Sequence, residues 1–536
     1  MKKPAGSAAD LLLTNGRIHT GNPQQPRAEA IAIHGNRIVA VGSSAGLANL
    51  GKKGTRIVDL GGRFACAGFV DAHVHLLSAG LSLSRANLSG CPSRDEMLSV
   101  LRDKAAALPE GAWVQGRGWD QERLEGAWPR REWLDETLGD RPAVVWRVDG
   151  HILWASSAAL AAAGITAETP DPAGGEIVRD GTGRPTGILK ENACALMESA
   201  VPPLTAEERR EAVESALAEL RRHGVTSVHE MSPPEVLRTC AGLREEGRLS
   251  VRVSAWAPLE EDLSQAERLR EQYPPSDPMI RMETLKGFVD GTLGARTAAM
   301  SDPYADEPST SGMLLYDEEG LARILRRAHR SGFQLALHAI GDRAVHVALS
   351  ALDGLGGGAR ARRHRIEHAE VVSAGDVSRF NSVGAVASMQ PGQLASDGLW
   401  LARRLGPGRL SRAFPWRALV DQGTPLIFGT DWPIEPLSPV RTLATACGPA
   451  RAFLPAEQAS GLADQGRLTV GEALDAMTRA GAWATFEDGI KGSLSAGRLA
   501  DIVVLSADPF TMPPEALGEL TVDLTVFDGR IVHARE

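Results

Sequence analysis

The sequence predicts an α/β protein: a (β/α)8 barrel of the TIM type, a small β-sandwich domain made from both termini, and an insertion after the first barrel strand. Three observations support this fold class. Short strand-like segments occupy both ends of the chain, apolar runs alternate with amphipathic helical stretches between them, and eight such runs are found. The chain has 536 residues, 43% hydrophobic and 23% charged, which is ordinary for a globular protein.

The terminal β domain is predicted from short apolar segments that Gly and Asn residues separate. In the N-terminal part the segments are 11–13, 17–19, 30–34, 37–41 and 56–60, and near the C-terminus they are 501–505, 524–527 and 530–533. Two all-β pieces at opposite ends of a chain suggest one domain. We therefore expect residues 1–62 and 490–536 to form a composite β domain, with the barrel in residues 63–489.

The barrel is predicted from apolar segments that alternate with Arg- and Glu-rich helical stretches, such as 206–223 and 318–330. The expected barrel strands are 64–73, 225–229, 251–256, 282–287, 333–338, 364–368, 385–390 and 425–430. Eight strands are the number that closes a TIM-type barrel. Residues 80–205 are rich in Trp and Gly and do not follow the pattern, so we expect an insertion there that covers the barrel mouth.

The net charge indicates which partners the protein can bind, and the cysteine spacing indicates its cellular compartment. The formal net charge of -9 argues against a nucleic-acid partner, which would normally show a basic stripe. The five cysteines are scattered without a Cys-x-x-Cys pair, which fits a reducing cytoplasm better than a disulfide framework. We find no signal peptide and no apolar run long enough to span a membrane, so a cytoplasmic location is expected. The oligomeric state stays open, a homo-oligomer included.

The motif His73-Val74-His75 is the most informative feature, and it follows the mostly apolar run 64–72. Side chains alternate faces along a strand, so both imidazoles would point toward one place. Two neutral imidazoles aimed together suit Zn²⁺ or a similar divalent ion. Two polar residues that merely close a strand explain the dyad equally well, so matching ligands elsewhere must decide.

Four other expected barrel strands end in a residue that can bind metal or move protons. These residues are Lys286, His338, His368 and Asp431. Functional residues of such barrels gather at the carboxyl ends of the strands. Each residue alone is a weak signal, but together with the dyad they indicate a metal site.

The motifs around these residues resemble the amidohydrolase superfamily. Residues 68–76 (GFVDAHVHL) are similar to its opening signature. Later motifs resemble the subgroup called YtcJ-like or amidohydrolase family 3, which includes N-substituted formamide deformylases. They are 285–291, 296–298, 337–342, 365–369 and 429–433, with further matches at 148–151, 174–177 and 500–505. The sequence departs from the family pattern at Ala67, where such proteins often carry proline. This position lies outside the ligand set.

The resemblance implies a role for each candidate ligand. His73 and His75 would hold the more buried metal, which Asp431 would also contact, and His338 and His368 would hold the more exposed one. Lys286 would be carboxylated and bridge two metals. A lysine amine is a poor ligand at neutral pH because it is protonated, whereas a carboxylated lysine is an anionic oxygen donor. The alternative is a lysine in a salt bridge with a neighbouring carboxylate, with one metal bound.

The expected activity is that of a metal-dependent amidohydrolase that cleaves the C–N bond of a small amide or N-substituted formamide. A metal-activated hydroxide would attack the carbonyl, and Asp431 would act as general base and then general acid. The same site acting on a cyclic amide, carbamate or ester is an alternative. A metal-poor homologue with a binding or regulatory role is another, although the six ligand candidates argue against it.

Five residues are candidates for contacts with the substrate. Trp119, Asp120 and His151 lie in the insertion, where they either line a pocket or serve as turn and packing residues, and packing explains Trp119 slightly better. Arg296 offers a planar fork for a substrate carboxylate. Trp432 follows a candidate ligand directly, so it is expected in the pocket wall.

Overall fold

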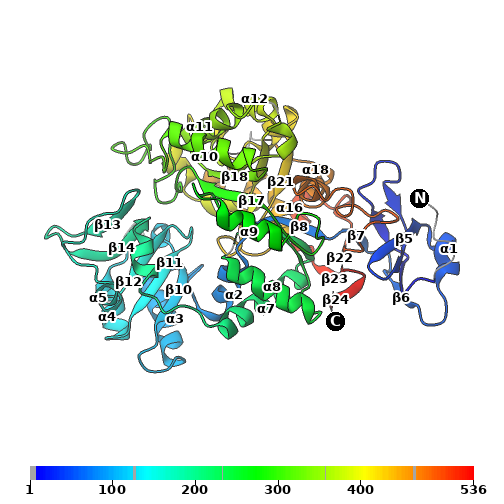
Figure 1. Cartoon of the computed structure of the whole chain (residues 1–536), viewed down its shortest axis with the longest axis horizontal. Coiled ribbons are helices and arrows are strands. Elements are labelled where there is room, and N and C mark those ends of the chain that lie inside the picture. Colours follow the sequence, from blue (N-terminus) through cyan, green and yellow to red (C-terminus); the bar gives the residue numbers. More distant parts are fainter. Residues whose placement is uncertain are drawn as a thin grey trace.

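The computed structural model describes residues 8–124, 128–231, 233–356, 358–460, 462 and 466–535. Figure 1 shows a central barrel with its helices, the insertion on one side of it and the terminal β strands on the other. The strands form four sheets: one of eight strands in the barrel, two in the terminal domain and one in the insertion. The predicted fold class, a (β/α)8 barrel with a β-sandwich domain and an insertion, is confirmed.

The barrel sheet has the strand order β21-β20-β19-β18-β17-β16-β15-β8, and neighbouring strands run parallel. The strands are β8 (Phe69–Val74), β15 (Val225–Met231), β16 (Arg252–Pro258), β17 (Ile280–Phe288), β18 (Gln334–Ala339), β19 (Arg365–His368), β20 (Val386–Met389) and β21 (Leu426–Phe428). Nearly all their residues are buried, which explains why they read as apolar runs. The ring is nearly closed after β21, where the Asp431 N–H donates to the His73 carbonyl at 2.7 Å.

The run 64–73, expected as one barrel strand, is divided at Gly68. Its first half, β7 (Phe64–Ala67), pairs with strands of the terminal domain, and only β8 belongs to the barrel. A Cβ on Gly68 would lie 2.3 Å from Thr226 Oγ1, so the close approach to β15 requires glycine at this crossing. The expectation of a single strand is therefore wrong. We propose Gly68, instead of residue 62, as the boundary between the terminal domain and the barrel.

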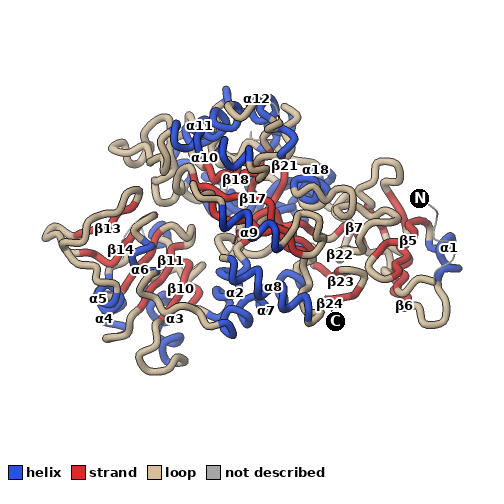
Figure 2. Tube along the Cα trace, in the orientation of Figure 1, coloured by secondary structure: helices blue, strands red, loops and turns tan. Residues whose placement is uncertain are grey.

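Helices surround the barrel strands (Figure 2). The helix α7 begins with a capping box, in which Thr205 and Glu208 each bond the backbone N–H of the other. The barrel helices are α2 (Leu76–Ser84), α7 (Ala206–Arg222), α8 (Pro234–Glu245), α9 (Ser264–Gln272), α10 (Glu318–Arg330), α11 (Asp342–Asp353), α12 (Ala374–Val383), α13 (Pro391–Asp397), α14 (Leu401–Leu405), α15 (Trp416–Asp421), α16 (Pro439–Cys447), α17 (Ala456–Ser460), α18 (Val470–Ala476) and α19 (Arg479–Ala484). None of the described helices is long and apolar enough to cross a lipid bilayer.

Two sheets with the orders β5-β4-β1-β6 and β24-β23-β22-β7-β2-β3 form the terminal domain. Their strands are β1 (Leu11–Thr14), β2 (Arg17–His19), β3 (Arg27–Ala28), β4 (Ala30–His34), β5 (Arg37–Gly42), β6 (Arg56–Asp59), β22 (Ile502–Leu505), β23 (Val522–Phe527) and β24 (Arg530–Ala534), and the short α1 (Ser44–Leu47) follows β5. Strands from both ends of the chain share one core, which includes Leu13, Ile31 and Val504. A buried ion pair between Arg252 of β16 and Asp501, at 2.7 and 3.0 Å, ties this domain to the barrel.

The insertion forms a six-stranded sheet of its own between α2 and α7. Its elements are β9 (Ala86–Asn87), α3 (Arg94–Ala106), β10 (Val114–Trp119), α4 (Arg131–Leu138), β11 (Ala143–Arg147), β12 (Ile152–Ala155), α5 (Ser157–Ala162), β13 (Gly175–Arg179), β14 (Pro185–Glu191) and α6 (Cys194–Glu198). Two apolar clusters pack on this sheet, one around Trp154 and one around Leu189. The insertion therefore has a core of its own and can present a rigid wall to the barrel.

Candidate active site

A cavity of about 1440 Å³ lies between the carboxyl ends of the barrel strands and the insertion. Its wall contains all six ligand candidates of the sequence: His73, His75, Lys286, His338, His368 and Asp431. Residues 116–118 and 146–151 of the insertion form another part of the wall. The insertion thus contributes directly to the space in front of the barrel strands.

Three candidate ligands bring their donor atoms together without rearrangement. One atom each from His73, His368 and Asp431 lies within 4.8 Å of the other two. The ring centroids of His73 and His368 are 5.0 Å apart, and those of His338 and His368 are 4.5 Å apart. His75 joins the group through its Nε2, which lies 3.1 Å from Asp431 Oδ1. Imidazole nitrogens and a carboxylate at this spacing are a suitable donor set for a divalent metal.

Three of the histidines each direct one ring nitrogen at an acceptor group of the protein. His73 Nδ1 lies 2.7 Å from the Glu367 carboxylate. His368 Nδ1 lies 2.8 Å from Gln390 Oε1, and His338 Nε2 lies 3.1 Å from the carbonyl of Gly291. Each partner is an acceptor, so each fixes the tautomer that leaves a lone pair on the second nitrogen.

Burial keeps these imidazoles neutral. It holds the pKa of His73 well below its usual range, and the nearby Lys286 adds to the effect. Burial likewise lowers the pKa of His338 and of His368 far below the ordinary value for histidine. Because a metal binds the neutral form of imidazole, the folded chain holds these side chains in the protonation state that binding requires.

Lys286 is buried at the centre of the group. Its Nζ lies 3.5 Å from His73 Nε2, and it lies over two aromatic rings, 5.6 Å from the centroid of Trp256 and 5.0 Å from that of Phe288. Among the described residues no carboxylate lies within 4.0 Å of the amine, so the salt bridge considered as an alternative is not formed. Burial lowers the pKa of Lys286 to about 8.

Asp431 lies directly beside the histidines. Its Oδ1 faces His75, and its Oδ2 accepts a hydrogen bond from Gln393 Nε2 at 3.3 Å. Burial would raise the pKa of Asp431, but His73 and His75 outweigh this effect and hold the pKa below its usual range. Asp431 and His368 both have positive φ, 60° and 72°, which costs a non-glycine residue energy. Backbone strain of this kind is commonly found at functional sites.

Two buried carboxylates set the loops that carry the candidate ligands. Asp71 accepts from the backbone and hydroxyl of Thr430, at 2.9 and 2.6 Å, and so joins the ends of β8 and β21. Asp290 accepts from three backbone N–H groups, those of Ala299, Ile340 and Gly341, at 2.8 to 3.0 Å. This joins the segment after β17 to the segment after β18, which places Lys286 and His338 relative to each other.

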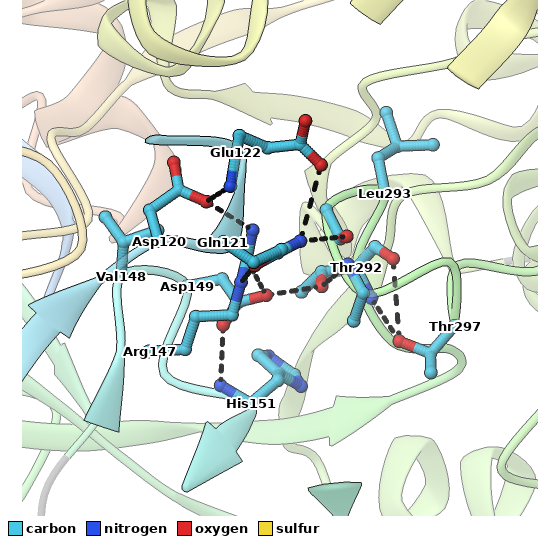
Figure 3. A network of polar contacts seen from close by, with 12 residues as sticks. Asp120, Gln121, Glu122, Arg147, Val148, Asp149, His151, Thr292, Leu293 and Thr297 are labelled. Carbon is cyan, nitrogen blue, oxygen red and sulfur yellow. Dashed lines mark hydrogen bonds and ion pairs between the residues drawn. The ribbon is translucent and has the colours of Figure 1, made fainter. Parts of the chain in front are cut away.

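A polar network links the insertion to the segment after β17 (Figure 3). The buried Arg147 donates to Asp120 at 3.0 Å, to Gln121 at 2.6 Å and to Asp149 at 2.5 Å. Asp149 also accepts from the Thr292 hydroxyl at 2.8 Å, so the insertion is held to the barrel by charge-assisted hydrogen bonds.

His151 comes two residues after Asp149 of this network, and its ring lies beside the candidate ligand His338. Its ring centroid lies 5.5 Å from that of His338, and its Nδ1 lies 2.8 Å from Glu191. Burial would lower the pKa of His151, but Glu191 and Asp149 outweigh it and raise the pKa to about 9. His151 thus presents a cationic donor to the cavity, unlike the neutral histidines beside it.

Comparison with known proteins decides the family. The profile described as "Amidohydrolase family" matches residues 56–533, which is most of the chain. The chain belongs to the amidohydrolase family.

Three relatives match this amidohydrolase over most of its length. It is 33% identical to Protein LONG AFTER FAR-RED 3 of Arabidopsis thaliana, over 94% of this chain and 88% of that protein. It is 32% identical to YtcJ of Bacillus subtilis, over 97% and 98%, and 28% identical to the N-substituted formamide deformylase of Arthrobacter pascens, over 98% of each chain. The solved structure of an uncharacterized metal-dependent hydrolase from Pyrococcus horikoshii is 30% identical, with a TM-score of 0.76 over 94% and 99%.

The five candidates for substrate contacts in this amidohydrolase divide into two groups. Asp120, His151 and Trp432 line the cavity. Trp119 does not, because its ring is buried in the core of the insertion and its Nε1 donates to the carbonyl of Val145. Arg296 also lies outside the cavity wall, where its guanidinium pairs with Asp306, so neither Trp119 nor Arg296 contributes to the wall.

Sequence reasoning missed the residues that hold the ligand candidates in place. These are Asp71, Asp290, Glu367 and Gln390, together with Glu191 behind His151. A signal was available for three of them, because each lies within four residues of a candidate ligand in a motif that resembles the family. Gln390 and Glu191 carry no such signal, since their contacts depend on how separate strands meet.

Proposed function

We propose that this amidohydrolase is a metal-dependent hydrolase that cleaves the C–N bond of a small amide or N-substituted formamide. The observation that carries the proposal is the pair of buried, neutral imidazoles of His73 and His368, each with a ring nitrogen within 4.8 Å of an Asp431 carboxylate oxygen. The relative named N-substituted formamide deformylase supports the choice of bond, since it matches along its whole length.

His73, His75 and Asp431 would hold one ion, and His338 and His368 would hold a second. The donor set fits, because Glu367, Gln390 and Gly291 each accept from one ring nitrogen and so leave a lone pair on the other nitrogen of that ring. A divalent ion, which we take to be Zn²⁺, would lower the pKa of a water molecule and polarise the substrate carbonyl.

Lys286 is proposed to become carboxylated and to link the two ion positions. A buried ammonium without a carboxylate partner is unfavourable, and this lysine has none among the described residues. Its lowered pKa leaves part of the amine neutral near pH 8. The neutral Nζ can form a bond to the carbon of CO₂ and release a proton, which yields an anionic carbamate in the same place.

The protein residues would move the protons. Asp431 Oδ2 would accept a proton from the attacking water and return it to the leaving nitrogen, while Gln393 keeps the carboxylate oriented. The cationic His151 would donate a hydrogen bond to the substrate oxygen as negative charge develops there. A cytoplasmic location remains a proposal based on the cysteine spacing.

Metal analysis combined with product detection tests the proposal. Purified full-length protein is dialysed against metal-free buffer, its metal content is measured by mass spectrometry, and it is incubated with an N-alkylformamide, an N-acylated amine, a lactam, a carbamate and an ester. We expect one to two zinc ions per chain and release of an amine and a carboxylate. Only trace metal, with no hydrolysis after reconstitution, would overturn the proposal. Hydrolysis of the ester or the carbamate alone would mean that the substrate is of that class and not an amide.

A further inference from the structure

One wall of the cavity carries three carboxyl groups, two of which have no ion pair with any described residue. The wall is formed by α13 and by the segments after β19 and β21, and it contains Glu370, Asp397 and Glu435. Glu435 has a partner, because its Oε2 lies 3.4 Å from Arg441 Nη2. In the described part of the chain, neither the Glu370 nor the Asp397 side chain has a hydrogen bond or an ion pair.

The nearby guanidinium groups are already engaged. Arg147 binds Asp120 and Asp149, and Arg117 donates to two backbone carbonyl groups. They therefore do not neutralise Glu370 and Asp397 by direct contact. Burial, and then the neighbouring Glu435, raise the pKa of the Asp397 carboxyl, which reflects the cost of placing like charges together.

A third acceptor, Gln393 of α13, lies on the same wall and contacts the reaction centre. Gln393 is buried, and its Oε1 has no hydrogen-bond partner among the residues that the structure describes. Its Nε2 donates to Asp431, so the free oxygen lies on a side chain that contacts the candidate proton carrier. Asp397 is the last residue of α13, where the helix carbonyl groups disfavour a negative charge. Packing alone does not account for this concentration of acceptors.

We propose that Glu370, Gln393 and Asp397 form a subsite for a primary ammonium group carried by the substrate. An ammonium group has three N–H donors and no acceptor, which matches three oxygen acceptors from three side chains. A desolvated cation would supply the counter-charge that the two carboxylates lack. The inference rests on the proposed function in one respect, namely that the cation belongs to the amide whose C–N bond is cleaved next to Asp431.

Two substrates that differ by one ammonium group test the subsite. Full-length, zinc-loaded protein is assayed with N-butylformamide and with N-(4-aminobutyl)formamide. We expect kcat/KM to favour the ammonium substrate by about tenfold or more, as is typical of a desolvated charge pair. In Glu370→Gln and in Asp397→Asn this ratio should fall toward one. The matched control is Glu219→Gln, which removes a carboxylate of α7 that also lines the cavity but pairs with Arg222 at 3.1 Å, and it should keep the wild-type ratio.

Equilibrium binding gives a readout that needs no hydrolysis. The affinities of 1,4-diaminobutane and 1-butylamine are compared by calorimetry on the same proteins. The wild type and Glu219→Gln should prefer the diamine, and Glu370→Gln and Asp397→Asn should lose the preference. Thermal unfolding identifies a variant that does not fold, and the other variant then carries the test. Residues that only supported the fold would lower the Tm when replaced without changing either preference.

The outcomes separate the subsite from the proposed function. Equal kcat/KM values for both formamides and equal affinities for both amines would overturn the subsite and leave the hydrolase proposal intact. If neither formamide is hydrolysed but the diamine binds more tightly through Glu370 and Asp397, formamide hydrolysis fails and the subsite stands. A preference that persists in both variants would also overturn the subsite.

Discussion

Replacement of Glu367 by Gln is expected to weaken metal binding by about 10- to 100-fold, although residue 367 would not contact the metal. Glu367 is fully buried and acts only as an acceptor. Its Oε2 faces His73 Nδ1 at 2.7 Å, and its two oxygens accept from Arg365 at 2.8 and 3.2 Å. Gln keeps the volume of Glu but replaces one acceptor oxygen by a donor NH₂ group.

No orientation of the amide satisfies both neighbours. If its NH₂ group faces His73, two donors meet at about the distance of the former hydrogen bond. If its NH₂ group faces Arg365, the buried guanidinium loses an acceptor. A lost buried partner costs about 1 to 3 kcal/mol. His73 can relieve the first arrangement by moving its proton to Nε2, which removes the lone pair that a metal needs. A loss of 10- to 100-fold corresponds to about 1.4 to 2.8 kcal/mol, within this range.

The assay is the zinc dissociation constant, measured by competition with a chromophoric chelator and checked by metal content after dialysis. The matched control is Glu283→Gln on β17, a carboxylate that pairs with Arg281 at 2.7 Å and does not line the cavity. Circular dichroism verifies that both variants fold. An unchanged dissociation constant in folded Glu367→Gln, or an equal loss in the control, would refute the reasoning that Glu367 sets the tautomer of His73.

Three further predictions concern proton transfer, metal stoichiometry and pH dependence. Asp431→Asn should retain metal but lower kcat by about 10²- to 10⁴-fold, and a near-normal kcat would remove Asp431 from proton transfer. Lys286→Ala should lower the zinc content from two ions to about one if Lys286 links them, whereas unchanged stoichiometry excludes the link. Burial lowers the pKa of His364 to about 3, and its Nδ1 accepts from the Leu335 N–H. The unfolded chain therefore binds a proton that the folded chain rejects, and this residue costs the protein about 2 kcal/mol of stability as the pH falls from 7.5 to 5. His364→Asn keeps an acceptor that does not titrate, so urea unfolding should show a correspondingly weaker loss, and identical pH profiles would contradict the reasoning.

The barrel could be predicted because its strands are buried on both faces. Such strands read as apolar runs, and the intervening helices carry caps and amphipathic patterns, as at Thr205 for α7. The run 64–73 was misjudged because apolar character continues across Gly68, while the strand changes its partners there. Hydrophobicity predicts that a segment is buried, but it does not predict with which sheet the segment pairs.

The position of the candidate site was predictable for a related reason. Parallel strands of a barrel end at one rim, so polar residues that close several strands must approach one another. The placement of Trp119 and Arg296 was not predictable in this way. Their partners, the Val145 carbonyl and Asp306, come from other segments, and only the folded chain shows that these partners occupy them.

By itself, the sequence determined the fold class, the family resemblance and the six side chains at the strand ends, because burial and strand periodicity are local properties of the chain. The tertiary structure decided how those side chains are used. It placed Glu367 and Gln390 against the histidines and set His151 apart from them through Glu191. Within the described part of the chain, it left the Glu370 and Asp397 side chains without an ion pair. The physical reason is that tautomers, pKa values and unmet charges depend on contacts between segments distant in sequence, and these contacts exist only once the chain is folded.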